Sequence, residues 1–240
     1  MSTNQHPVVL PAEALEASDG EVVDANIDIV NAMYSELLGE DEIATNALRS
    51  YYVDFYLTEA LDGGFAQYVV SAGEREDIDG FVRDGLREMG ASRHLELFEA
   101  TSDAFDALSD ADAEEYLEGD GEPSEAVKAL EALDDRFEET LDDEDLVALN
   151  AAWLRGQEGL LALDDDAIED EIARRVGLIP DLEARRAEAE ALAEGLDEGF
   201  GDAYDDEDYD DFDDDEDEDS ARDEDAAHEP HAEKSEGLAK

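Results

Sequence analysis

The 240-residue sequence contains no cysteine, only three lysines and no long apolar run. The lack of cysteine excludes disulfide bonds, thiol catalysis and zinc sites with cysteine ligands. A membrane-spanning helix needs ~20 consecutive apolar residues, and residues 1–20 lack the basic and apolar segments of a signal peptide. We therefore expect a soluble, cytoplasmic protein that does not bind membranes.

The sequence is equally poor in motifs that carry chemistry. It has no P-loop, no dinucleotide-binding glycine motif and no nucleophile elbow. His228 and His231 have metal-ligand spacing but lie in a polar segment, His94 stands alone, and the run Asp213–Asp219 lacks the glycine of a calcium-binding loop. We predict no catalytic residue, no metal site and no cofactor.

What the sequence does contain is acid. Seventy-four Asp and Glu residues face 15 Lys and Arg residues, and the formal net charge is −59. Residues 1–200 hold 54 acidic and 12 basic residues, so a charge of −42 remains on the part that must fold. Such a charge repels nucleic acid and anionic membranes and favours a basic partner. Adaptation to high salt is an alternative explanation, because acid-rich and lysine-poor surfaces are typical of it.

The apolar residues recur at helical spacing along most of the chain, which predicts an all-α fold. We expect a flexible lead-in over 1–22, a compact multi-helix domain over 23–180, a surface helix over 181–198 and a disordered acidic tail over 199–240. In the tail, 14 of the 18 residues 202–219 are acidic, interleaved with three aromatic residues that could stack on arginine.

Local signals set the expected helix boundaries. The first helix should run from Asp24 to Gly39. Gly90 should end a later helix, Ser92 should cap the next, and further helices should begin at Ser109 and Ser124. Another helix should run over 146–160, interrupted or bent at its glycines.

The aromatic stretch Tyr51–Gly73 carries little charge and contains a glycine pair at its centre. We expect a helix that breaks at Gly63–Gly64, followed by a short buried helix, with a strand as the alternative. The glycines would permit close approach or a positive φ, and Phe65 and Tyr68 would fill the core. The Gln67 amide would satisfy backbone groups exposed at the break. These roles are structural.

The motif DGGFAQY, from Asp62 to Tyr68, is followed by Met89, Gly90 and Ala91, and later by the pattern LDDRF at 133–137. These motifs together resemble the DNA-mimic protein family, over residues 25–176. The resemblance implies an acidic, mostly helical protein that occupies the DNA-binding surface of a transcription factor. It would then act in transcription regulation without binding nucleic acid itself.

Nine carboxylates lie within residues 131–145, and several recur every fourth residue. If this segment is helical, they are spaced by ~2.5 Å along the axis, between the charge densities of single-stranded and duplex DNA. We therefore predict a partner-binding surface on two clusters: Glu131, Asp134, Asp135, Glu138, Glu139 and Asp142, with Asp164, Asp165 and Glu169. The acids at 164–166 equally suit a helix N-terminus.

Three functions remain open at this point. The leading one is a mimic of DNA that blocks a basic DNA-binding protein. The second is an immunity-type inhibitor of a basic toxin such as a nuclease. The third is a salt-adapted helical domain with an unrelated role. A homodimer is possible under the first, because two copies would double the length of the charged face.

Overall fold

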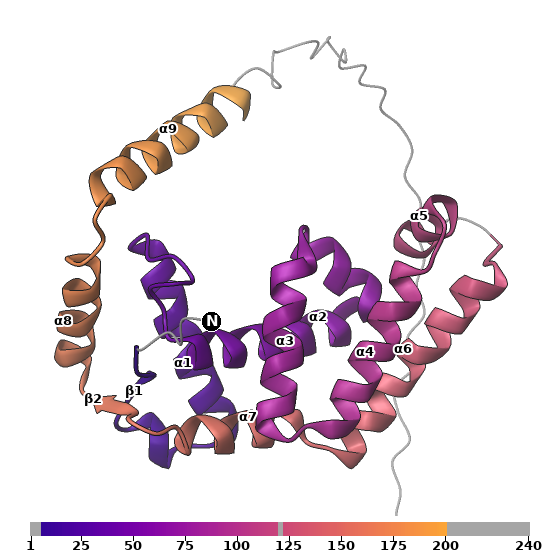
Figure 1. Ribbon diagram of the computed structural model, residues 1–240, viewed down its shortest axis with the longest axis horizontal. Coiled ribbons are helices and arrows are strands. Elements are labelled where there is room, and N and C mark those ends of the chain that lie inside the picture. The colour runs from indigo at the N-terminus through magenta and orange to yellow at the C-terminus, as the bar shows by residue number, and fades with distance from the viewer. Residues whose placement is uncertain (1–5, 120–121, 201–240) are drawn as a thin grey trace, which may run out of the picture. The chain divides into compact units, whose positions relative to one another are not determined.

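The computed structural model describes residues 6–119 and 122–200 (Figure 1). The chain divides into a unit that ends at Ala193 and a second unit that begins at Glu194. The elements from β1 to α8 lie in the first unit. The predicted disordered tail lies outside the described residues, apart from its first two positions, 199 and 200, which belong to the last helix.

The described residues are mostly helical, as the apolar spacing predicts. Two short strands and a 3-10 turn accompany nine α-helices. In chain order the elements are β1 (Val9–Pro11), the turn η1 (Ala14–Glu16), α1 (Asp19–Ser35), α2 (Thr45–Ala72), α3 (Arg75–Met89), α4 (Ser92–Asp106), α5 (Asp110–Glu118), α6 (Glu125–Asp143), α7 (Leu146–Arg155), β2 (Leu161–Leu163), α8 (Asp165–Val176) and α9 (Leu182–Phe200). None of the described helices is long and apolar enough to span a membrane.

The N-terminal region differs from the expected lead-in. Residues Val8–Leu10 are buried, and α1 begins at Asp19 rather than at Asp24. Ser18 caps α1 by accepting a hydrogen bond from the Glu21 backbone N–H, while the Glu21 side chain accepts from the Ser18 backbone N–H. This reciprocal capping box satisfies two helix-end donors, so the helix starts one turn earlier than apolar spacing indicates.

The expected helix over 146–160 also ends early. Helix α7 stops at Arg155, and the chain continues into β2, which pairs in parallel with β1. Gly159, with a φ of 77°, lies in the turn between α7 and β2. The pairing of β1 with β2 holds the N-terminal segment against the rest of the first unit. Local sequence patterns could not reveal this pairing, because the two strands are ~150 residues apart in the chain.

Two apolar cores fill the unit, and α2 contributes to both. The first half of α2 packs with α1, α7, α8 and the two strands around Val30, Leu48 and Ala151. The second half packs with α3, α4, α5 and α6 around Phe65, Tyr68 and Phe98. The aromatic stretch therefore joins the two cores rather than forming a site of its own.

The predicted break in α2 is confirmed, and the segment after it is helical rather than a strand. Gly63 and Gly64 both leave helical backbone angles, and Gly64 has a φ of 69°. Only glycine adopts this conformation without strain. The other predicted signals gave mixed results: Gly90 ends α3 and Ser109 and Ser124 cap their helices, but α1 ends at Ser35, not Gly39, and Ser92 is not a cap.

Candidate partner-binding surface

Helix α6 carries most of the acids that the sequence singles out. It is capped by Ser124 and buries Val127, Leu130 and Phe137 against α4 and the kinked half of α2. The opposite side is open to solvent. Five predicted site residues are exposed there: Glu131, Asp135, Glu138, Glu139 and Asp142. Their spacing of three and four residues places them on one side of the helix.

These five carboxylates have no ion-pair partner among the described side chains. On α6 the ion pairs lie at the ends, between Glu125 and Lys128 at 3.0 Å and between Asp143 and Arg93. Of the 12 basic side chains in residues 1–200, all but Arg136, which itself lies on α6, form an ion pair. The charge of these five acids is therefore not neutralised by a basic side chain in the described part of the chain.

Asp134 does not belong to this exposed row. Its carboxylate lies partly buried, where one oxygen accepts the Phe65 backbone N–H at 2.9 Å and the other accepts the Tyr116 hydroxyl at 2.6 Å. Burial raises the pKa of Asp134 above its usual value, although both hydrogen bonds oppose the shift. The residue fastens α6 to the kink of α2 and to α5, so its role is structural.

The glycine pair makes this contact possible. A Cβ atom on Gly64 would lie 3.1 Å from the Asp134 carboxyl carbon, so the carboxylate can reach the Phe65 N–H only where glycine precedes it. The predicted role of Gln67 is wrong. Its amide donates to the side chains of Glu59 and Ser71, at 3.1 and 3.0 Å, and Asp134 takes over the backbone group at the break.

The bond from Tyr116 brings α5 beside α6, and α5 has an acidic row of its own. Asp110, Glu114 and Glu118 are exposed and recur every fourth residue. These three acids are not among the predicted site residues, although their spacing is a usable signal. What could not be read from the sequence is that α5 packs on α6. The exposed acids of the two helices thus belong to neighbouring elements.

The second predicted cluster is not brought together with the first. Asp164 is the N-cap of α8, accepting the Ala167 backbone N–H at 3.0 Å, and Asp165 lies in the first turn. Glu169 is exposed farther along α8, as is its neighbour Asp170. The buried face of α8 belongs to the first core, whereas that of α6 belongs to the second. The acids at 164 and 165 therefore have the helix-stabilising position that the sequence left open.

Exposed carboxylates are not confined to α5 and α6. Every helix of the first unit carries at least one among its described residues, except α7, which has no acidic residue. Charge alone therefore does not single out a surface. The feature that distinguishes α6 from α5 is the length of its row, because five exposed, unpaired acids follow one another along one side of α6 and three along α5.

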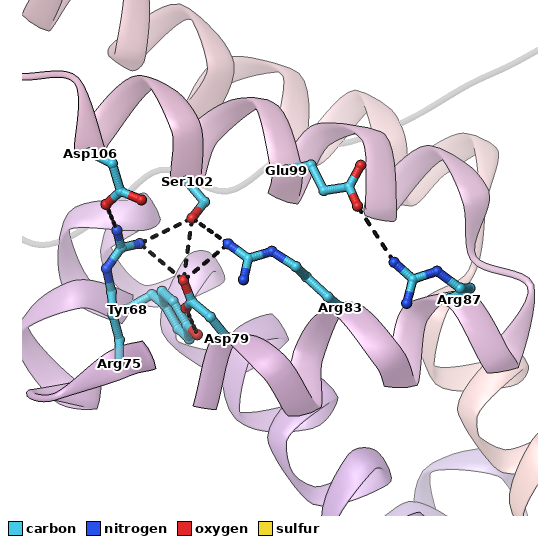
Figure 2. Close-up of polar contacts among 8 residues, drawn as sticks. All are labelled: Tyr68, Arg75, Asp79, Arg83, Arg87, Glu99, Ser102 and Asp106. Carbon is cyan, nitrogen blue, oxygen red and sulfur yellow. Dashed lines mark hydrogen bonds and ion pairs between the residues drawn. The ribbon is translucent and has the colours of Figure 1, made fainter. Parts of the chain in front are cut away.

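The contact between α3 and α4 shows the opposite arrangement (Figure 2). Asp79 is 4% exposed, and it accepts hydrogen bonds from Tyr68 at 2.7 Å and from Ser102 at 3.2 Å. The guanidinium groups of Arg75 and Arg83 each lie 3.4 Å from the same carboxylate. Tyr68 of the sequence motif is thereby anchored to both helices.

Arg75 completes this contact, which we call the α3–α4 seam and which consists of Asp79, Arg75, Arg83, Ser102 and Asp106. The Arg75 guanidinium also pairs with Asp106 and lies over the rings of Phe65 and Phe105, at 5.5 and 5.0 Å from their centroids. A buried charge is tolerated when it is paired and hydrogen-bonded in this way. Within the part of the chain that the structure describes, no three metal-binding side chains gather at one place.

The fold and this surface define a class: a mostly helical, strongly acidic domain with unpaired carboxylates along α6. Over residues 41–157 the chain belongs to the DMP19-like protein family, the family of DNA mimic protein 19. The match is shorter than the expected 25–176. It contains α2 to α7, including the kink, the seam and the acidic helices. Membership suggests a protein of the DNA-mimic type. No curated protein and no solved structure matches the chain.

Proposed function

We propose that this protein is a DNA mimic that occupies the basic DNA-binding surface of another protein, such as a transcription factor. The observation that carries the proposal is the run of five exposed, unpaired carboxylates along α6. Family membership supports it, because the matched residues include this helix. The protein would act by binding and not as an enzyme, without direct contact to nucleic acid.

The spacing of the α6 charges suits this role. From Glu131 to Asp142 the helix rises by ~16 Å, so the five carboxylates follow one another at ~4 Å along the axis. Phosphates along one DNA strand are spaced by ~3.4 Å. A basic surface that fits a strand would therefore meet a similar charge density on α6. The α5 row of Asp110, Glu114 and Glu118 would extend the same surface.

The arrangement of these acids lowers the stability of helix α6, and the folding of the domain does not explain why they are there. Among the five exposed, unpaired acids of α6, three pairs stand four residues apart: Glu131 with Asp135, Asp135 with Glu139, and Glu138 with Asp142. Each such pair of like charges destabilises a helix by ~0.2–0.5 kcal/mol. A partner that supplies arginine or lysine would remove this repulsion on binding, which provides a reason for the acids to be there.

A second candidate, a salt-adapted helical domain with an unrelated role, is favoured by a different observation. Exposed acids occur on nearly all the described helices, which is what adaptation to a salty solvent would produce.

An immunity-type inhibitor of a basic toxin would use the same α6 surface, and only the identity of the partner separates it from a mimic. A homodimer would lengthen the acidic face, and light scattering of the purified protein tests that state directly.

Affinity purification from an extract of the native cells tests the proposal. The wild-type protein should retain a DNA-binding protein at moderate salt, and the triple variant Glu131→Gln, Asp135→Asn, Glu138→Gln should lose it. A matched triple variant, Asp28→Asn, Glu36→Gln, Glu88→Gln, removes the same charge from exposed sites on and near α1 and on α3. Equal loss in both variants would support general electrostatics in place of mimicry. Recovery of no basic protein would exclude the proposed function.

A further inference from the structure

Helix α4 begins without a capping side chain of its own. Ala91 occupies the N-cap position, and Ser92, which the sequence suggests as the cap, is already helical. The free backbone N–H groups of Arg93 and His94 donate instead to the carboxylate of Glu144, at 3.1 and 3.0 Å. Glu144 follows the last residue of α6, so the cap comes from 50 residues farther along the chain.

The His94 side chain makes a second contact with the same residue. The ring is fully buried, and its Nε2 lies 3.0 Å from the backbone oxygen of Glu144. Because a carbonyl oxygen only accepts hydrogen bonds, Nε2 carries the proton in this contact. The other nitrogen, Nδ1, is buried and has no hydrogen-bond partner within the described part of the chain. The ring edge packs against Phe137 of α6 at 5.7 Å between centroids.

We propose that the contact between His94 and Glu144 is a pH-sensitive joint, which fastens the C-terminal end of α6 to the first turn of α4 and opens when His94 is protonated. A second proton on the ring would bind to Nδ1, which has no hydrogen-bond acceptor in contact within the described part of the chain. An ionised group buried without a partner is costly, so the protonated ring favours an open, hydrated arrangement.

The charged groups around the ring are few. Arg93 precedes it on α4, and its guanidinium is directed to Asp143 on α6. The Glu144 carboxylate favours a positive ring, but it already accepts the two backbone N–H groups. Burial outweighs the attraction and lowers the pKa of His94 below its usual value.

The sign of the pH effect follows from this direction. A histidine whose pKa is lowered in the folded state contributes stability above its unfolded pKa of 6.5. That contribution falls as the pH drops below 6.5 and is lost once the pH passes the folded-state value. The joint is therefore closed at neutral pH and opens as the pH falls below 6.5, releasing the end of α6 at which Asp142 lies.

Amide hydrogen exchange at Arg93 and His94 tests the joint on the full chain without any partner. After correction for the intrinsic pH dependence of exchange, protection in the wild type should fall severalfold between pH 7.5 and 5, because the unfolded and open forms bind a proton that the closed form does not. In His94→Gln, which keeps a donor but cannot titrate, protection should be constant over that range. Glu144→Gln should be less protected throughout yet keep the pH dependence.

Constant protection in the wild type, or the same fall in His94→Gln, would overturn the proposal. If His94→Gln does not fold, the ring titration of His94 followed by NMR in the wild type decides the question. A pKa at or above 6.5 there would contradict it. The joint does not depend on the proposed function, since each of these readouts is free of any binding partner.

Discussion

The α3–α4 seam and the outer side of α6 use charge in opposite ways. In the seam, the buried Asp79 is matched by Arg75 and Arg83, and two hydroxyl groups satisfy its remaining acceptor sites (Figure 2). On α6, five carboxylates have no basic partner among the described residues. Most of the arginines of the first unit pair with acids of another element, which leaves the outer acids of α6 to attract cations from outside the molecule.

The first prediction breaks the seam. Asp79→Asn keeps the shape of the side chain but leaves Arg75 and Arg83 without their shared counter-charge. Breaking a buried ion pair on one side destabilises a protein by ~3–5 kcal/mol, and thermal unfolding should show a loss of this order. The matched variant Asp135→Asn on α6 should change stability by less than ~0.5 kcal/mol. Similar losses in the two variants would contradict the contrast between the regions.

The second prediction concerns the kink that positions α6. Gly64→Ala forces alanine to a φ of 69° and places its Cβ 3.1 Å from the Asp134 carboxyl carbon. We expect a loss of ~2–3 kcal/mol in the free energy of unfolding. Gly80→Ala on α3 is the control, because a Cβ there meets no atom within 4 Å. It should stabilise the helix by ~0.5–1 kcal/mol. Denaturant unfolding of both variants makes the comparison.

The third prediction concerns an acid that is partly buried without a base. Burial and the nearby Asp24 raise the pKa of Asp54 from 3.8 to about 6. A raised pKa gives a stabilising contribution that is fully present below pH 3.8 and is lost as the pH rises through 6. Asp54→Asn should therefore stabilise the protein at pH 7 by ~1–2 kcal/mol, after allowance for solvent screening. Thermal melts from pH 4 to 8 should show the gain only at the higher values.

The smallest expected effect comes from the acids of α6 themselves. The triple variant Glu131→Gln, Asp135→Asn, Glu138→Gln removes three repulsive pairs, so stability should rise by ~0.5–1.5 kcal/mol at low salt. The gain should vanish near 1 M salt, where the screening length is ~3 Å. A loss of stability at low salt would mean that these acids have a structural role, as Asp134 does.

Local sequence signals predicted the helical fold well. The break at Gly63–Gly64 and the caps at Ser109 and Ser124 are confirmed because they depend on residues within one or two turns. The exposed acids of α6 follow from the same helical spacing. The capping box at Ser18 was equally local, yet weak apolar periodicity around it led to a helix start five residues too late.

The remaining features depend on partners far apart in the sequence. Asp134 has the spacing of a surface acid, but it bonds to Phe65, 69 residues away, and so leaves the exposed row. Glu144 caps a helix that begins some 50 residues earlier, and β1 pairs with a strand near residue 162. Helical periodicity assigns a residue to a face, and it does not say which other element that face meets.

The most direct test of the central claim is competition with DNA. A DNA-binding protein captured by the wild type is mixed with a labelled duplex, and release of the duplex is followed by fluorescence anisotropy as each variant is added. We expect the wild type and the control variant with substitutions at Asp28, Glu36 and Glu88 to displace the duplex at the same concentration. The variant with substitutions at Glu131, Asp135 and Glu138 should need a concentration at least ~10-fold higher for the same displacement. Equal displacement by all three proteins would contradict a partner-binding surface on α6.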